Sequence, residues 1–243
     1  MFVEREFFIG FDDLMFGNKA SNKAIIKHLV DMAGIHSNIV GYGLNDREKV
    51  GHTWILLAWK VELFRRPSYS ETIRIKTWSR PMKSYYALRD FQIFDKEKKL
   101  IGIASSKWVF INNEKESLAK IPKEVADLYK SEDIQVFQDD DIGKLSEGIE
   151  GGSSLSVKVT RNMIDVNNHV NNIYYLDIVN ESLPEDLYKK EYNKFEIMYK
   201  KEIKREYVDT TVNCICTKTL RTNMIEIKSA DNKILHAIVK LSE

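Results

Sequence analysis

Apolar residues recur at helical spacing near the start of the chain and again after its midpoint. In the first stretch positions 25, 26, 29, 30 and 33 share one helix face, which predicts a helix over residues 19–33 that ends at Gly34. In the second, the pattern predicts a helix over residues 173–182 that ends before Pro184. Each half of the chain is therefore expected to contain one main helix.

Alternating β-branched and aromatic residues dominate most of the remaining sequence and predict strands. EREFFIG precedes the first helix, and TWILLAWKVEL, ETIRIKTWS, YYALRDFQIFD and LIGIASSKWVFIN follow it. SLSVKVTRN precedes the second helix, and FEIMYKKEI, TTVNCICTKTL, MIEIKSA and ILHAIVKLS follow it. One helix followed by an antiparallel meander, twice over, predicts an α+β fold with an internal repeat.

An acidic segment rich in Gly and Ser, QDDDIGKLSEGIEGGSSL, separates the two halves and has no periodicity. We therefore predict one domain over residues 1–138, a linker over 139–152 and a second domain over 153–243.

The two halves can be aligned by eye at a shift of 149 positions, which superposes the two helices, and at a shift of 139 further on, which places ETIRIKT on TTVNCIC. In this alignment the first half has apolar residues where the second has polar residues that could be catalytic, so chemistry is expected only in the second half. The aligned pairs are Asn18 with Asn167, Asn22 with Asn171, Phe16 with Asp165, Ala20 with His169, and Leu63 with Glu202.

The stretch IDVNNHVNNIYYLDIV places Asp165, Asn167 and His169 two residues apart, just before the second helix. On an extended segment this spacing puts all three side chains on one side, so we expect them to converge. Taken singly, Asp is ordinary as a helix cap, Asn in a turn and His in a strand. Capping needs only one side chain, however, and Asn171 or Asn172 is closer to the helix. Because a buried unpaired polar group costs about 1–3 kcal/mol, three together favour a functional site if the site is buried.

These residue types suit acyl transfer or hydrolysis. A helix N-terminus can hold a carbonyl oxygen as it gains negative charge. His169 is suited to accept a proton from water or to orient a partner, Asp165 to position the imidazole or to attack directly, and Asn167 to hold water or the carbonyl. The sequence contains no G-x-S-x-G elbow, P-loop or dinucleotide fingerprint, and no cofactor is indicated.

Charge and composition argue against several other classes of protein. The formal net charge of +1 lacks the basic excess that is typical of nucleic-acid binders and membrane-surface proteins. The start of the chain does not resemble a secretory signal, and no apolar run is long enough to span a membrane, so a cytoplasmic protein is expected. Cys214 and Cys216 are too few for a disulfide framework and are expected to be buried reduced thiols, since a metal site would need two further ligands.

A family resemblance rests on several of these segments. DVNNHVNNIYYLDIVNESLP closely resembles the D-x-N-x-H-V-N-N segment, followed by a helix ending in E-S-x-P, of acyl-ACP thioesterases, which release fatty acids from acyl carrier protein (ACP). MYKKEIKREYVDTTV is similar to the family's strand with Arg-Arg-Glu-Cys followed by a basic residue. FFIGFDD, GYGL, the run from TWILL to QIFD, and IPKEV occur in the family's order, so the resemblance covers nearly the whole chain.

The resemblance implies two tandem hotdog domains, each a long helix wrapped by an antiparallel β-sheet. The N-terminal domain would shape the acyl pocket and carry no catalytic residue. The catalytic residues would be Asp165, Asn167, His169 and Glu202. Without the family, Glu202 is equally interpreted as one charge on a solvated edge strand. The implied role is a hydrolase of fatty acid biosynthesis that needs no cofactor or metal.

One departure from the family concerns the nucleophile. The cysteine that follows the strand glutamate in plant members is Ile203 here, so a Cys–His mechanism is unavailable at this position. Cys214 and Cys216 are expected on the next strand and are poor substitutes. The resemblance then implies either water activated by Glu202 and His169 or attack by Asp165 through an anhydride.

The implied partner is acyl carrier protein with a phosphopantetheine-linked acyl chain. Carrier proteins are acidic, and a basic cluster around Glu202 is suited to steer one, although lysines also protect sheet edges. Tryptophans of the first half fit either an acyl pocket or a plain core. One chain would contain two hotdog units, so a monomer or a homodimer is expected. The basic cluster is Lys200, Lys201, Lys204 and Arg205, and the tryptophans are Trp54, Trp59 and Trp78.

Three alternatives remain. The first is an acyl-CoA thioesterase of the same fold, and the second is a non-catalytic hotdog protein that binds acyl ligands, which would not need Asp, Asn, His and Glu. The third is a hotdog dehydratase, which the Asp-x-Asn-x-His order and the strand glutamate fit less well.

Overall fold

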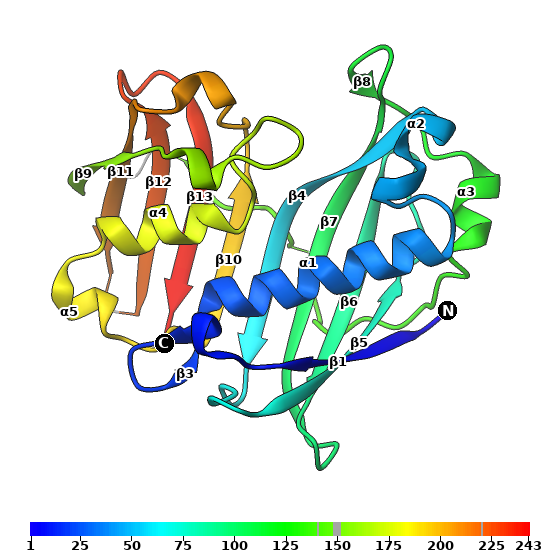
Figure 1. Ribbon diagram of the computed structural model, residues 1–243, viewed down its shortest axis with the longest axis horizontal. Helices are drawn as coiled ribbons and strands as arrows, with labels where there is room; N and C mark the ends of the chain where they lie inside the picture. The colour runs from blue at the N-terminus through cyan, green and yellow to red at the C-terminus, as the bar shows by residue number, and fades with distance from the viewer. Residues whose placement is uncertain (140, 148–151, 220) are drawn as a thin grey trace. The chain divides into compact units, whose positions relative to one another are not determined.

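The computed structural model describes residues 1–139, 141–147, 152–219 and 221–243 (Figure 1). These residues form two compact units, Met1–Ile142 and Gly143–Glu243. The predicted linker over residues 139–152 spans the boundary between the units, and its residues 140 and 148–151 lie outside the described part of the chain.

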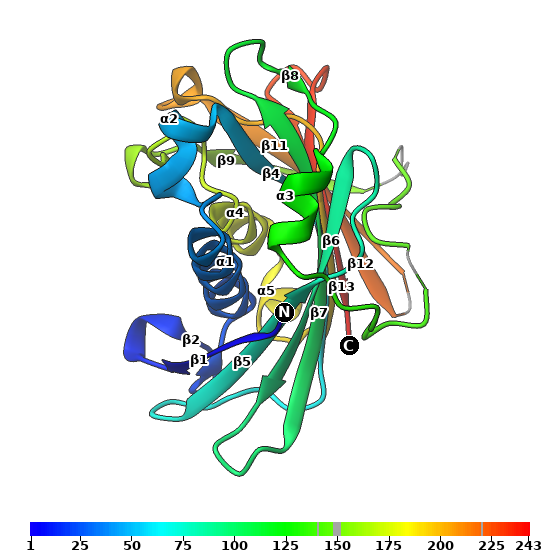
Figure 2. The ribbon, with the colours of Figure 1, turned by 90° about the vertical axis from the view of Figure 1, so that its right-hand side faces the viewer.

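The N-terminal unit is a five-stranded antiparallel sheet with one long helix, α1, packed on a single face (Figure 2). Within this unit the strands lie in the order β1-β5-β6-β7-β4. Small elements connect or flank the main ones. The main elements are β1 (Val3–Phe8), α1 (Asn22–Ile39), β4 (His52–Leu63), β5 (Thr72–Ser79), β6 (Tyr86–Phe94) and β7 (Leu100–Asn112). The small elements are η1 (Phe11–Asp13), β2 (Leu14–Met15), β3 (Lys19–Ala20), η2 (Leu44–Asp46), α2 (Arg47–Val50), β8 (Ser117–Leu118) and α3 (Lys123–Leu128).

Helix α1 begins three residues later than predicted, because Lys19–Ala20 form the strand β3, and it also ends later than predicted. The Ser21 hydroxyl accepts the N–H of Ala24 at 3.0 Å and caps the helix start. The predicted end at Gly34 is wrong, because the helix continues to Ile39. His36 is fully buried on the continued inner face, and this packing offsets the roughly 1 kcal/mol that Gly costs inside a helix. The helix ends instead before Gly41, whose positive φ of 76° supplies the left-handed turn.

The C-terminal unit repeats this architecture with shorter elements. Its strands lie in the order β10-β13-β12-β11-β9, and α4 packs on the sheet through a buried stripe that includes Leu176 and Ile178. Helix α4 ends before Pro184, as predicted. The elements are β9 (Ser153–Lys158), η3 (Arg161–Met163), α4 (Tyr174–Ser182), α5 (Glu185–Tyr188), β10 (Lys194–Tyr199), η4 (Arg205–Tyr207), β11 (Thr211–Lys218), β12 (Thr222–Ser229) and β13 (Leu235–Ser242). The α+β prediction, with one helix and one antiparallel sheet in each half, is confirmed.

The internal repeat is present, but the predicted shift of 149 positions is wrong by one residue. Ser21 N–H donates to Asp13 O at 2.8 Å, and Asn171 N–H donates to Met163 O at the same distance. The turn residue with positive φ is Asn18 (59°) in the first unit and Asn168 (60°) in the second. The correct shift before the helices is therefore 150 positions.

After the strand that follows each helix the shift is 136 positions rather than 139, so the counterparts of all four predicted site residues change. Phe64 and Arg65 donate backbone N–H groups to Ile101 O in the first unit, as Lys200 and Lys201 do to His236 O in the second. The earlier pairings with Phe16, Asn18, Ala20 and Leu63 are wrong, and not every counterpart is apolar. None of the four residue types recurs at its equivalent position. The observed counterparts are Met15 for Asp165, Gly17 for Asn167, Lys19 for His169 and Arg66 for Glu202.

Two of the three tryptophans considered above, Trp59 and Trp78, are buried in the core of the first unit, and Trp54 is partly buried. Trp59 and Trp78 are at most 1% exposed. Trp54 packs against Phe110 with ring centroids 4.7 Å apart and meets the Tyr129 ring edge-on. These three side chains therefore contribute to the packing of the N-terminal unit.

Within residues 1–139, 141–147, 152–219 and 221–243, no helix is both long and apolar enough to cross a bilayer.

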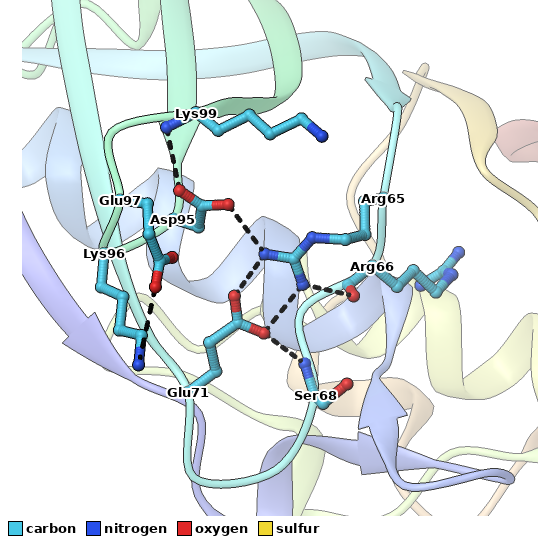
Figure 3. A network of polar contacts seen from close by, with 8 residues as sticks. All are labelled: Arg65, Arg66, Ser68, Glu71, Asp95, Lys96, Glu97 and Lys99. Atoms are coloured by element: carbon cyan, nitrogen blue, oxygen red, sulfur yellow. Dashed lines mark hydrogen bonds and ion pairs between the residues drawn. The ribbon is translucent and has the colours of Figure 1, made fainter.

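One polar cluster ties two loops of the N-terminal unit together (Figure 3). Arg65 Nη1 donates to Glu71 Oε2 at 2.9 Å, and its Nη2 donates to the other Glu71 oxygen and to Asp95 Oδ2, the latter at 3.3 Å. The same carboxylates accept the N–H groups of Ser68 and Lys99. The hydrogen bonds from Arg65 lower the pKa of Glu71, and the Lys99 N–H lowers that of Asp95. The loop after β4 is thus joined to the turn between β6 and β7.

Replacing the guanidinium tests this connection. Arg65→Met should lower the Tm at neutral pH by roughly 2–4 °C, because a bidentate, partly exposed pair is worth about 1 kcal/mol. The Glu71 pKa is lower in the folded chain, so the stabilisation is present at neutral pH and is lost as the carboxylate is protonated. The Tm difference from the unsubstituted protein should therefore shrink below pH 4.5, the ordinary value for this carboxyl.

The matched control is Arg74→Met, which removes a single exposed contact to Glu6 at 3.2 Å. It should leave the Tm nearly unchanged at every pH. Equal Tm losses for the two variants at neutral pH would contradict a stabilising role of the Arg65–Glu71 pair. A Tm loss in Arg65→Met that persists unchanged at pH 3 would also contradict it.

Candidate functional site

Residues 164–170 form a tight turn that precedes α4. Asp165 N–H donates to His169 O at 2.8 Å, Asn168 N–H donates to Asp165 O at 3.1 Å, and Ile164 pairs with Val170 in an isolated bridge. The expectation of an extended segment is therefore wrong, because the chain reverses direction here. Asn168 adopts a positive φ of 60°, a conformation that asparagine tolerates better than most residues.

The Asp165 carboxylate organises this turn. Its Oδ1 accepts the backbone N–H of Asn167 at 2.8 Å and that of His169 at 3.3 Å. Its Oδ2 lies 3.4 Å from the Asn167 amide nitrogen, so these two side chains are in contact. Such bonds are common in turns that begin with aspartate, and they alone give Asp165 a structural role. Asp165 and His169 are half-buried, whereas Asn167 is exposed.

The turn is paired with the segment that follows β10. Val170 N–H donates to Ile203 O at 2.8 Å, and His169 forms a bridge with Lys204. Glu202, two residues before Lys204, is thereby a diagonal neighbour of His169 across the pairing, within reach of long side chains. In the described part of the chain, neither the His169 ring nor the Glu202 carboxylate makes a hydrogen bond or ion pair, so both groups are available to a ligand or water.

A buried phenol lies close to both carboxylates. The Tyr175 hydroxyl accepts the N–H of Ile203 at 3.2 Å. Burial raises the pKa of Tyr175, and the negative charges of Glu202 and Asp165 raise it further. Both acidic side chains therefore act on the same small region at the start of α4.

The N–H groups at the start of α4 are only partly free. Asn171 accepts the N–H of Ile173 on its side chain at 3.2 Å and that of Tyr174 on its carbonyl at 2.9 Å. Asn171, rather than Asn172, therefore supplies the acceptors just before the helix, whose N-cap residue, Ile173, makes no side-chain cap. Among the described residues, no acceptor meets the N–H of Asn172, which precedes the helix by two residues. An N–H without an acceptor near the start of a helix is suited to hold an oxygen that gains negative charge.

Basic side chains surround Glu202. Lys200, Lys201, Lys204 and Arg205 are all exposed. Lys200 pairs with Glu147 at 2.8 Å, and Arg205 donates to the Asn168 side chain at 3.3 Å. We define the basic patch as these four lysine and arginine residues. The ammonium groups of Lys201 and Lys204 have no ion pair with any residue that the structure describes.

The structure identifies three residues that the sequence analysis did not single out: Tyr175, Tyr199 and His236. His236 is fully buried on β13, and its Nδ1 lies 3.0 Å from Lys201 O, next to Glu202. Tyr199 donates to Asn172 O at 3.0 Å. The available signals were weak: a histidine inside an apolar strand and two aromatic residues with polar tips, which most often serve a core.

The two cysteines do not take part in this arrangement. Cys214 and Cys216 lie on β11 as free thiols and are 1% and 5% exposed, as predicted. Burial raises the pKa of Cys214 to about 12 and also raises that of Cys216, so neither thiol is activated at neutral pH. Ile203 is fully buried and has no nucleophilic atom. Groups of three or more potential metal ligands are absent from the part of the chain that the structure describes.

Comparison with known protein families gives two matches. Residues 2–129 match the acyl-ACP thioesterase N-terminal domain, and residues 146–240 match the acyl-ACP thioesterase C-terminal domain. Among curated proteins, an oleoyl-acyl carrier protein thioesterase of Coriandrum sativum is 28% identical over 210 residues, covering 79% of this chain and 57% of the relative. A palmitoyl-acyl carrier protein thioesterase of Cuphea hookeriana is 29% identical over 202 residues, covering 78% and 49%. The chain thus spans about half the length of these relatives.

Two solved structures share the fold over nearly the full chain. An acyl-ACP thioesterase from Bacteroides thetaiotaomicron superposes with a TM-score of 0.88 at 21% identity, covering 99% of this chain and 97% of that one. A 12:0-ACP thioesterase from Umbellularia californica gives 0.85 at 21% identity, covering 99% and 96%. The predicted tandem hotdog fold is therefore confirmed.

Proposed function

Because the chain belongs to the acyl-ACP thioesterase family, we propose that it hydrolyses the thioester of a fatty acyl group carried on acyl carrier protein. The products are a free fatty acid and the carrier with its phosphopantetheine thiol. The observation that carries the proposal is the pairing of residues 164–170 with the segment after β10. It supports the proposal because His169 forms a bridge with Lys204, two residues after Glu202, just before α4.

The proposed site divides the reaction between these groups. The thioester carbonyl oxygen takes the position in front of the Asn172 N–H, and the Asn167 amide orients the carbonyl or the water. Glu202 and His169 hold a water molecule between them and remove its proton as its oxygen attacks the carbonyl carbon. The tetrahedral intermediate then expels the phosphopantetheine sulfur, which takes up the proton that the base accepted.

Asp165 is better suited to hold the turn than to attack the thioester. Its Oδ1 already accepts two backbone N–H groups, and its Oδ2 lies near the Asn167 amide. A carboxylate held in this way is a weaker nucleophile, and it cannot turn toward a substrate without breaking the turn. We therefore favour activation of water over an aspartyl anhydride.

Substitution of the two catalytic groups tests the reaction. His169→Ala and Glu202→Gln should each lower kcat for acyl-ACP by about 10²–10⁴-fold, the range expected when a general acid–base group is lost. Glu181→Gln is the matched control, since Glu181 is an exposed carboxylate on α4, and it should retain full activity. Hydrolysis is measured as release of free thiol from acyl-ACPs of graded chain length.

Asp165→Asn separates the two mechanisms, because its side-chain oxygen can still accept the turn's N–H groups but cannot form an anhydride. We expect a loss of at most about 10-fold. Loss of activity as deep as that of Glu202→Gln would favour the anhydride, and binding of acyl chains without turnover by the unsubstituted protein would refute the hydrolase assignment.

The proposed partner is acyl carrier protein, and the basic patch is its proposed docking surface. Lys201 and Lys204 are exposed on either side of Glu202 in the sequence, and neither forms an ion pair with a described residue. The overall charge of the chain is close to neutral, so electrostatic steering of an acidic carrier needs a local patch of this kind.

Charge reversal tests the docking surface. The double substitution Lys201→Glu and Lys204→Glu should raise KM for acyl-ACP more than 10-fold at low ionic strength and leave KM for the matched acyl-CoA within about 2-fold. The change should diminish with added salt, because screening weakens interactions between exposed charges. Lys115→Glu with Lys120→Glu, an equal charge change on exposed lysines of the N-terminal unit, serves as the control. A uniform effect on both substrates would exclude a carrier-specific surface, and a large preference for acyl-CoA in the unsubstituted protein would indicate the acyl-CoA thioesterase instead.

A further inference from the structure

Glu202 is exposed, and its carboxylate has no partner of its own among the described residues, so its position depends on how the neighbouring backbone is held. Two tyrosines hold this backbone. Tyr175, on α4, accepts the N–H of Ile203, the residue that follows Glu202, at 3.2 Å. Tyr199, the last residue of β10, donates its hydroxyl to Asn172 O, just before α4, at 3.0 Å.

The two hydrogen bonds run in opposite directions between the same two segments. Each tyrosine extends from its own element to the backbone next to the other element. The rings of Tyr175 and Tyr199 also contact each other edge to face, with centroids 5.2 Å apart and an interplanar angle of 86°. Burial raises the pKa of both hydroxyls above the ordinary value, so both remain protonated and Tyr199 remains a donor throughout the neutral range.

The N-terminal unit shows what happens where the site residues are missing. The equivalents of Tyr175 and Tyr199 are Ile25 and Leu63, which cannot form these bonds. Arg66, at the position of Glu202, makes the connection itself. Its Nη1 donates to Ala20 O at 2.7 Å, and its Nη2 donates to the Asn22 side chain.

The two units thus connect the segment after the strand to the start of the helix through different side chains. In the first unit Arg66 joins the segment after the strand to the start of the helix, and its side chain is buried at 3% exposure with hydrogen bonds from both Nη atoms. Where the tyrosines make the connection, residue 202 is exposed and its carboxylate is free to act.

We propose that Tyr175 and Tyr199 are a pair of positioning residues that fix Glu202 and the Asn172 N–H relative to each other. This inference rests on the proposed thioesterase function, because it assigns the pair to the geometry of that site. The pair does not touch the reacting atoms. It sets the distance between the base and the group that holds the carbonyl oxygen.

The simplest alternative is that both tyrosines only stabilise the core. Tyr192 of the same unit provides the comparison. It is also buried, its hydroxyl donates to Leu187 O at 3.0 Å and accepts from the Asn223 amide at 3.1 Å, and neither partner belongs to the site. Tyr192→Phe therefore removes a buried hydroxyl without moving Glu202.

The experiment compares Tyr175→Phe, Tyr199→Phe and Tyr192→Phe, each of which keeps the ring. We expect kcat for acyl-ACP to fall 10- to 100-fold in the first two while KM stays within about 2-fold, because geometry rather than binding is lost. Tyr192→Phe should show a comparable loss of Tm and full activity. The double variant of Tyr175 and Tyr199 should be no more than about 3-fold slower than the slower single variant, because the two tyrosines act as one unit.

A readout independent of activity keeps this inference separate from the proposed function. Hydrogen exchange of the Ile203 amide, followed by NMR, should be at least about 10-fold faster in Tyr175→Phe and unchanged in Tyr192→Phe. If the unsubstituted protein hydrolyses no acyl-ACP, the proposed function fails, even where the exchange result confirms the contact. If it is active and the Tyr175 and Tyr199 variants match Tyr192→Phe in kcat, or Ile203 exchange is unchanged in Tyr175→Phe, the positioning role is overturned.

Discussion

The candidate site depends on one backbone pairing, between the turn at residues 164–170 and the segment after β10. The hydrogen bond from Val170 N–H to Ile203 O and the bridge between His169 and Lys204 join two stretches that are far apart in the chain. Ile203 fixes the direction in which its neighbours face, because its side chain is fully buried and its backbone is bonded on both sides. Glu202 consequently lies exposed, two residues before the Lys204 that pairs with His169. Ile203 has no nucleophilic atom, and its buried side chain holds this segment against the core.

The two halves of the chain show how a repeated fold acquires a site in one copy. Both units pair the turn before the helix with the end of the strand after it, through equivalent hydrogen bonds of 2.8 Å. In the first unit a buried arginine, Arg66, adds a side-chain hydrogen bond between these two segments. In the second unit Tyr175 and Tyr199 add such hydrogen bonds instead. The backbone pairing is therefore common to both units. The units differ in which side chains form the additional hydrogen bonds between the paired segments.

The sequence was sufficient for the secondary structure and the fold because both rest on strong periodic patterns. Each main helix and strand was expected, and the family resemblance supplied the hotdog arrangement. The end of α1 was missed because packing of His36 outweighs the weak helix preference of Gly34. The repeat was misaligned by one residue because Asn167 and Asn168 are identical in type, and only Asn168 adopts the left-handed conformation of Asn18.

The sequence suggested which residues form the candidate site but not how they are arranged. The spacing of Asp165, Asn167 and His169 suggested one face of an extended chain, whereas side-chain hydrogen bonds from Asp165 close the segment into a turn. Such local bonds compete with extended structure, and no hydrophobic pattern reveals them. Tyr175 was hidden for a different reason: on a helix, an aromatic residue at a core position gives no sign that its hydroxyl reaches a backbone N–H on another element.

The central claim is that Glu202 and His169 act together on one water molecule. The most direct test is the activity of the double variant His169→Ala and Glu202→Gln relative to each single variant. If both groups serve one proton transfer, the double variant should have a kcat within about 3-fold of the slower single variant, because either substitution alone already disables the step. Losses that multiply, so that the double variant is slower by the product of the two single effects, would show that the two residues act independently and would contradict this account.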